Sequence, residues 1–181
     1  MSAPPVIIIA EPGPLISSVL RVEFTQMDFA VLMAATAPEA EEYAAHAIAS
    51  LVVLDVGTLR LAGYSACARI RRRSGYADRP IVLTSGDVSE RTRAAAKMAG
   101  ATVLLPKPYS VSDLLTAVTP HLRAGNPLLT HCATRPGPGQ DWTTAPAPVV
   151  TAGRNSALTR NGLLLPIVRS AGMKIPLYRK T

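Results

Sequence analysis

Four short apolar runs in the chain are each followed by a side chain that can do chemistry. The runs are Val6–Ile9, Leu51–Leu54, Ile81–Leu83 and Thr102–Leu105. The polar residues that follow them are Glu11, Asp55, Thr84 with Ser85 beside it, and Lys107. Carboxylates can hold Mg²⁺ and attack phosphorus, and an amine or a hydroxyl can contact phosphoryl oxygens. Together these residue types supply a carboxylate pair, a hydroxyl and a lysine that could act in one site.

The apolar runs have the form of buried parallel strands, which are short and rich in β-branched residues. Ala30–Met33 adds a fifth strand between the first and second of them. In a doubly wound sheet, ligands bind beyond the carboxyl ends of the strands. The polar residues at those ends are therefore expected to meet in one site.

Helical patterns separate the strands. Pro14 can open the first helix, in which Leu15, Val19 and Val22 recur at helical spacing. Thr36 and Glu39 fit a capping box for the second helix. The strict alternation of strands and helices predicts a parallel sheet with helices on both faces.

Three further signals mark helix boundaries. Gly63 is expected in the loop before a third helix at Tyr64–Arg73, whose basic end suits the helix dipole. Gly100 is expected to end the fourth helix as a C′ glycine. Ser110 and Asp113 resemble the start of a fifth helix, which is completed by Leu114–Leu122.

The bulk composition limits the class of protein. The chain has 181 residues, 48% of them hydrophobic and only 4% aromatic, so aliphatic side chains and alanine must fill its core. No apolar stretch approaches the roughly 20 residues that span a bilayer, and Met1–Pro5 lacks the basic start of a signal peptide. We therefore expect a cytoplasmic protein with no membrane partner. The cysteines Cys67 and Cys132 have no metal-site spacing, and Cys67 is expected to be buried.

The net charge of +7 is concentrated at the C-terminal end. Residues 1–123 hold 12 Lys/Arg and 11 Asp/Glu, whereas residues 124–181 hold 7 Lys/Arg and one Asp. The latter segment also holds seven prolines and six glycines. We predict one domain at residues 5–123 and a basic, disordered tail at residues 124–181. Nucleic acid is not expected as a partner, because the domain itself is nearly neutral.

The order and spacing of these residues resemble the receiver domain of two-component response regulators, which includes the chemotaxis receiver. The matching segments are Leu51–Asp55, Gly63, Thr84–Ser85, Gly100–Ala101 and Lys107–Tyr109. The resemblance covers about residues 5–123. It implies a flavodoxin-like α/β fold, a doubly wound five-stranded parallel sheet in the order 2-1-3-4-5, followed here by the Pro/Gly-rich tail.

The resemblance also implies roles for the polar residues. Asp55 would accept a phosphoryl group from a sensor histidine kinase or a phosphotransfer protein. Glu11, Asp55 and the carbonyl of Gly57 would hold Mg²⁺, while Thr84 and Lys107 would contact the phosphoryl group. Such a phosphoprotein is a phosphoacceptor in a phosphorelay and not an enzyme, apart from slow autodephosphorylation. Its output would be contact with a downstream protein through the fourth helix, fifth strand and fifth helix.

The chain departs from the family pattern in two places near this site. The family has two acidic residues after the first strand, where this chain has Ala10 and Glu11, so we expect weakened Mg²⁺ binding. The fifth strand of the family carries an aromatic switch residue, and this chain has Leu104 there. Because leucine cannot hydrogen-bond, a tyrosine-type switch coupled to Thr84 is not expected.

These departures leave an alternative, a degenerate receiver that acts as an interaction module without being phosphorylated. Two other classes fit less well. A phosphatase of the haloacid dehalogenase type needs a second aspartate as its general acid, and Gly57 occupies that place. A flavin-binding flavodoxin needs free backbone N–H groups after the first strand, where this chain has Pro12 and Pro14. The arginines at 69–73 are expected to be a solvated helix end.

Overall fold

The computed structural model describes residues 4–57, 60–122 and 124–128, and three strands at 156–158, 164–170 and 173–176. Its main sheet has five strands: β1 (Val6–Ala10), β2 (Ala30–Met33), β3 (Leu51–Asp55), β4 (Ile81–Ser85) and β5 (Val103–Pro106). All neighbouring strands are parallel, and the order is β2-β1-β3-β4-β5. The sheet order expected of a flavodoxin-like fold is confirmed.

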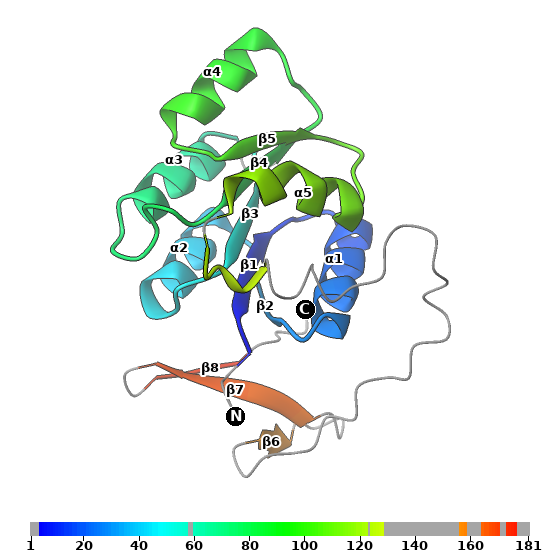
Figure 1. Ribbon diagram of the computed structural model, residues 1–181, viewed down its shortest axis with the longest axis vertical. Helices are drawn as coiled ribbons and strands as arrows, with labels where there is room; N and C mark the ends of the chain where they lie inside the picture. The colour runs from blue at the N-terminus through cyan, green and yellow to red at the C-terminus, as the bar shows by residue number, and fades with distance from the viewer. Residues whose placement is uncertain are drawn as a thin grey trace.

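Five helices connect the strands: α1 (Pro14–Gln26), α2 (Ala37–His46), α3 (Arg60–Arg71), α4 (Glu90–Met98) and α5 (Val111–Val118), the last continued by a 3-10 turn at Thr119–His121. Helices α1 and α5 cover one face of the sheet, and α2, α3 and α4 cover the other (Figure 1). Every crossover thus returns the chain to the edge of the sheet at which the strands begin. The carboxyl ends of the strands, and the residues that follow them, are thereby gathered at the opposite edge.

The core lies in two layers, one on each face of the sheet. In β1, Ile7 and Ile9 pack against α1 and α5, while Ile8 and Ala10 pack on the side of α2, α3 and α4. Alanines supply much of the second layer, as the low aromatic content requires; they include Ala40, Ala44, Ala66, Ala96 and Ala99. Successive strand residues point to opposite faces, and both faces are covered, so the strands read as continuous apolar runs.

The predicted helix ends are largely confirmed. The Thr36 hydroxyl accepts a hydrogen bond from the Glu39 N–H, but the Glu39 carboxylate accepts from the N–H of Ala35 instead of Thr36. A complete capping box occurs at Ser110 and Asp113. Gly100 follows α4 with a φ of +80°, the left-handed conformation that favours glycine at this position.

One local prediction is wrong, and one helix face differs from what its apolar pattern alone would suggest. Gly63 lies inside α3 and not in a loop, because α3 begins at Arg60. In α1, the apolar stripe Leu15, Val19 and Val22 faces solvent, and Leu15 is 77% exposed. The buried side of α1 is formed by Leu20 and Phe24. The two stripes have the same helical period, so only the position of the sheet decides which one is buried.

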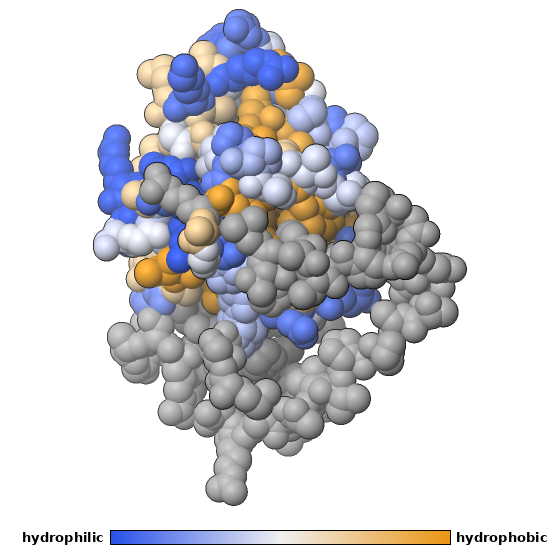
Figure 2. Space-filling model, viewed as in Figure 1, coloured by the Kyte–Doolittle hydropathy of each residue, from blue (hydrophilic) through white to orange (hydrophobic). Residues whose placement is uncertain are grey.

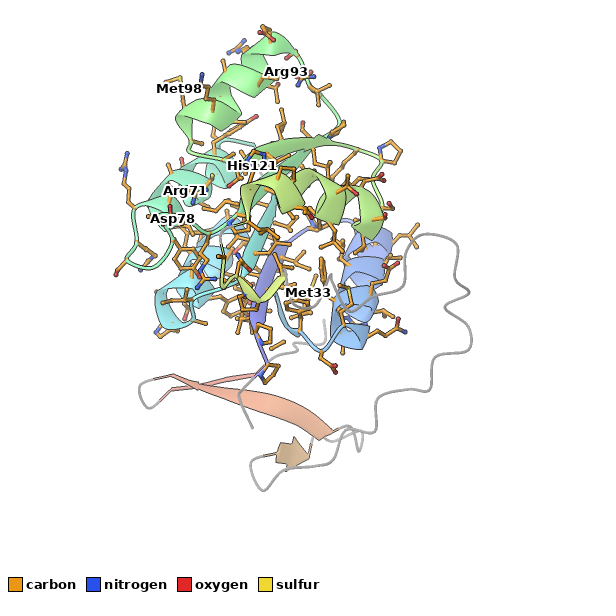
Figure 3. The ribbon with its side chains drawn as sticks, viewed as in Figure 1. Met33, Arg71, Asp78, Arg93, Met98 and His121 are labelled. Carbon is orange, nitrogen blue, oxygen red and sulfur yellow. The ribbon has the colours of Figure 1, made fainter. Side chains whose placement is uncertain are left out.

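The expectation of a solvated helix end at 69–73 holds only in part. Arg69 forms an exposed ion pair with Glu41. Arg71 is half-buried, and its guanidinium donates to the carbonyls of Gly100, Tyr76 and Arg79. Arg71 lies beside the turn that carries Asp78 (Figure 3). It therefore ties the end of α3 to the loops before β4 and β5.

The buried thiol of Cys67 gives a first prediction. Burial raises the pKa of Cys67 to about 11, although the nearby Arg71 acts to lower it, and the thiol donates to the Ala99 carbonyl. Since the thiolate is the reactive form, native Cys67 should not react with a disulfide reagent at pH 8, whereas the urea-unfolded chain should react at once. The assay uses a Cys132→Ser variant, which leaves Cys67 as the one thiol. Rapid labelling of the native variant would contradict the buried position.

The chain remains packed on the domain beyond residue 123. Leu128 is buried in the layer next to α1 and α5, and the Asn126 side chain donates to the Ser50 carbonyl. Further along, β6 (Ser156–Leu158), β7 (Leu164–Ser170) and β8 (Met173–Pro176) form an antiparallel sheet in that order. These strands were not predicted. The rest of the segment in which disorder is predicted lies outside the described residues.

The surface around α4 has hydrophilic side chains beside paler apolar ones (Figure 2), and the apolar Met98 of this helix is exposed. The exposed charged residues of α4 are Glu90, Arg91, Arg93 and Lys97. No described helix combines the length and the apolar content that crossing a bilayer requires.

Candidate functional site

The site is built at the carboxyl ends of the central strands. Glu11 follows β1 directly and Asp55 is the last residue of β3. Thr84 lies in β4 in register with Asp55, so the two side chains start from neighbouring positions. The carboxylates are withdrawn from solvent, with Glu11 4% and Asp55 0% exposed. The fold thus places two anions side by side in a buried environment, which requires a cation between them.

Lys107, directly after β5, provides that cation. Its Nζ lies 2.6 Å from Glu11 Oε2 and 3.1 Å from Asp55 Oδ1. Burial acts to lower the pKa of Lys107, but the hydrogen bonds and charges of Glu11 and Asp55 outweigh it and leave the pKa raised. The amine is therefore charged at physiological pH, and it bridges the two carboxylates.

A backbone N–H two residues along the chain donates to each carboxylate, on the oxygen that Lys107 does not contact in Glu11 and on the same oxygen in Asp55. The N–H of Gly13 donates to Glu11 Oε1 at 3.0 Å, and that of Gly57 donates to Asp55 Oδ1 at 3.0 Å. A Cβ at Gly13 would lie 2.9 Å from Glu11 Oε1, and one at Gly57 would lie 3.3 Å from Asp55 Oδ1. A side chain at either position would crowd the carboxylate, which would have to move to make room. The sequence analysis missed this role for Gly13.

Within the described part of the chain, three buried side-chain oxygens lack a hydrogen bond: Glu11 Oε2, Thr84 Oγ1 and Tyr109 Oη. Glu11 Oε2 has the Lys107 ion pair, and the two hydroxyls have no partner of good geometry. The charges of Glu11 and Asp55 and the hydroxyl of Thr84 all act on the pKa of Tyr109, so the three oxygens belong to one site. Buried polar groups are normally satisfied. A ligand with oxygen atoms would offer acceptors to the two hydroxyls, while Lys107 already pairs with Glu11 Oε2.

The hydroxyl of Ser85, which lies beside Thr84, already takes part in one hydrogen bond. Its Oγ accepts a hydrogen bond from the Asp87 N–H. Leu104 is half-buried against the layer that contains α2, α3 and α4. The Thr84 hydroxyl has no hydrogen-bond partner and is the stronger candidate for contact with a ligand, and Leu104 makes no polar contribution.

Ala10 brings no oxygen to the site, as the expectation of weakened Mg²⁺ binding assumed. Ala10 is 1% exposed and packs in the core layer next to α2 and α3. The residue after Glu11 is Pro12, which offers neither a carboxylate nor a backbone N–H. The described residues contain no group of three or more His, Cys, Asp or Glu side chains placed to hold a metal. The donor set is therefore two carboxylates with neighbouring carbonyls, which still suits a hard cation such as Mg²⁺.

Comparison with known proteins identifies the family. The model of the response regulator receiver domain matches residues 7–119. The response regulator MprA from Mycobacterium sp. (strain KMS) is 30% identical over 121 residues, which cover 67% of this chain and 52% of MprA. Protein PilG from Pseudomonas aeruginosa is 28% identical over 79 residues, covering 44% of this chain and 58% of PilG. The chain thus spans about half the length of the curated relatives it matches.

Solved structures support the fold. The chemotaxis protein CheY4 from Vibrio cholerae superposes with a TM-score of 0.60 at 23% identity, covering 66% of this chain and all of CheY4. The receiver domain of the sensor histidine kinase PA1611 from Pseudomonas aeruginosa, which holds a magnesium ion in its active-site cleft, gives 0.57 at 22% identity over 65% of this chain and 97% of that domain. The family model covers well over half of the chain, and the protein therefore belongs to the response regulator receiver domains of two-component systems.

Proposed function

We propose that Asp55 accepts a phosphoryl group from a histidine kinase or phosphotransfer protein, the partners with which receiver domains interact. The observation that carries this proposal is the position of Lys107 between the Asp55 and Glu11 carboxylates. A buried nucleophile with a cation 3.1 Å away can receive a phosphoryl group, because the cation offsets the charge that arrives. The unpaired Thr84 hydroxyl supplies a further donor on the same side.

The proposed reaction is a phosphoryl transfer between two nucleophiles. An Asp55 carboxylate oxygen attacks the phosphorus of a phosphohistidine, and an O–P bond forms as the P–N bond breaks. The bonding electron pair returns to the imidazole nitrogen of the donor protein. No oxidant or external proton is required, and the acyl phosphate remains on Asp55 until water removes it slowly.

The residues of the site would have three different roles in this reaction. Glu11, Asp55 and the Gly57 carbonyl would hold Mg²⁺, which when bound neutralises charge on the carboxylates and the phosphoryl oxygens. Gly13 and Gly57 keep the two carboxylates in place through their N–H groups. The Lys107 amine is close enough to pass from the Glu11 carboxylate to a phosphoryl oxygen on Asp55.

Downstream, we propose that output is contact with another protein through α4, β5 and α5. Slow loss of the phosphoryl group would reset the site. A receiver used only as an interaction module would have no need to keep a buried amine bridging two carboxylates. The retained Lys107 bridge therefore favours the phosphorylated receiver over the degenerate one.

The test is incubation of the full chain with acetyl phosphate, followed by intact mass spectrometry. We expect a mass gain of one phosphoryl group with Mg²⁺ and none with EDTA. No gain at any Mg²⁺ concentration would overturn the proposal and leave the interaction module in its place.

A further inference from the structure

Tyr109 lies between the candidate site and α5. It follows Lys107 and Pro108 and precedes Ser110, the N-cap of α5. Its ring packs against the core layer next to α1 and α5. Its hydroxyl is buried and has no hydrogen-bond partner of good geometry. A buried phenol oxygen without a partner costs free energy, and any state of the protein that supplies a partner is favoured in proportion.

The surroundings of this hydroxyl connect it to the site. Burial raises the pKa of Tyr109 most, the Glu11 and Asp55 carboxylates raise it further, and the Thr84 hydroxyl acts in the opposite direction. The phenol is therefore neutral at physiological pH and carries an O–H that can donate. Its natural acceptor among these neighbours is the Thr84 oxygen, which also lacks a partner.

A hydroxyl can donate one hydrogen bond while it accepts another. If Thr84 donates its proton to a phosphoryl oxygen on Asp55, its oxygen remains open to the Tyr109 O–H. Each bond in such a chain strengthens the next. An occupied site would thus draw the Tyr109 hydroxyl toward Thr84, and the backbone of Tyr109 continues directly into the first turn of α5.

We propose that Tyr109 is the positioning residue that reports site occupancy to α5, through a relay in which the Tyr109 hydroxyl donates to Thr84 and Thr84 donates to the phosphoryl group. This inference rests on the proposed function of Asp55. It gives the chain a polar link between its site and a helix even though Leu104 makes no hydrogen bond.

The experiment compares the full wild-type chain with Tyr109→Phe, which keeps the ring and removes only the hydroxyl. The occupant is beryllofluoride with Mg²⁺, a stable mimic of the phosphoryl group. Two quantities are measured: the affinity for beryllofluoride, and the NMR shift changes of the amides of Val111–Val118 at saturation. Tyr43→Phe is the control, because the Tyr43 hydroxyl bonds to Glu39 on α2, away from the site.

In wild type and Tyr43→Phe, occupancy should shift the α5 amides. In Tyr109→Phe the affinity should fall by about tenfold, the loss expected for one hydrogen bond in a charged network, and the saturated protein should lose most of the α5 shifts. Its resistance to urea without the occupant should be equal to wild type or greater, because the lost hydroxyl was buried without a bond. A fold defect is thereby separated from a lost relay.

Equal affinity and equal α5 shifts in Tyr109→Phe and wild type would overturn the relay and leave the proposed function intact. A wild-type chain that takes neither a phosphoryl group nor beryllofluoride would overturn the proposed function, and the relay with it. The two failures are therefore distinguishable.

Discussion

The Asp55→Asn variant is expected to gain no phosphoryl group under conditions in which the wild-type chain is modified. An amide has nearly the shape of the carboxylate, but its oxygen is a poor nucleophile and it brings no negative charge for Mg²⁺. The fold should survive, because Asp55 and Glu11 are buried together and share the single amine of Lys107. Removing one charge reduces their repulsion. Intact mass spectrometry checks the modification, and urea unfolding checks the fold.

Asp87→Asn is the matched control for this prediction. Asp87 lies in the loop after β4, and its carboxylate accepts hydrogen bonds from Ser89 and Thr92 instead of facing the site. This variant should be phosphorylated as readily as wild type. A phosphoryl gain by Asp55→Asn that equals the wild-type gain would show that another residue is the acceptor.

Replacement of Lys107 by methionine should have the second largest effect. Methionine fills similar space but leaves two buried carboxylates without their cation, and the free energy of unfolding should fall by about 3 kcal/mol. Phosphorylation by acetyl phosphate should slow by about 100-fold, the cost of losing one preorganised donor to a transferring group. Millimolar Mg²⁺ should restore part of the lost stability, because it binds the carboxylates only in the folded chain. Urea unfolding with and without Mg²⁺ measures the effect on stability.

The difference in unfolding free energy between wild type and Lys107→Met should depend on pH. Glu11 and Asp55 raise the pKa of folded Lys107, so the amine contributes stability below its unfolded pKa of about 10.4 and loses it as pH rises through the folded value. The gap between wild type and Lys107→Met should be constant from about pH 7 to 9 and shrink above about pH 10. Lys97→Met, at an exposed position on α4, should change stability by less than about 0.5 kcal/mol at any pH. An equal loss in the two variants would contradict the buried bridge.

The order of elements could be predicted from the sequence because each strand is buried on both faces. Such strands appear as uninterrupted apolar runs, and proline and glycine mark the helix ends between them. The same logic places Glu11, Asp55 and Lys107 at one edge of the sheet, where the structure brings them into contact. Parallel topology converts three positions far apart in sequence into neighbours.

The sequence did not reveal which face of a helix packs against the sheet or which atoms come into contact. The stripe of Leu15 and Val19 has the same period as that of Leu20 and Phe24, and sequence periodicity does not say which one meets the sheet.

The roles of Gly13 and of the Tyr109 hydroxyl were also missed, because they can be recognised only from interatomic contacts. The contact of Gly13 with the Glu11 carboxylate is set by a loop conformation that has no sequence signature. The aromatic residue after Lys107 and Pro108 marks the family. In this chain that residue is a tyrosine, whose hydroxyl is buried without a hydrogen-bond partner. A phenylalanine would pack as well without that cost, so the choice of tyrosine is a signal in the sequence.

The most direct test of the account is to locate the phosphoryl group on the chain. After incubation with acetyl phosphate and Mg²⁺, borohydride reduces an acyl phosphate to an alcohol, and peptide mass spectrometry identifies the residue that carried it. The account predicts reduction at Asp55 and at no other carboxylate. Reduction at Glu11, or an unmodified Asp55 peptide from a chain that has gained the mass of a phosphoryl group, would contradict it.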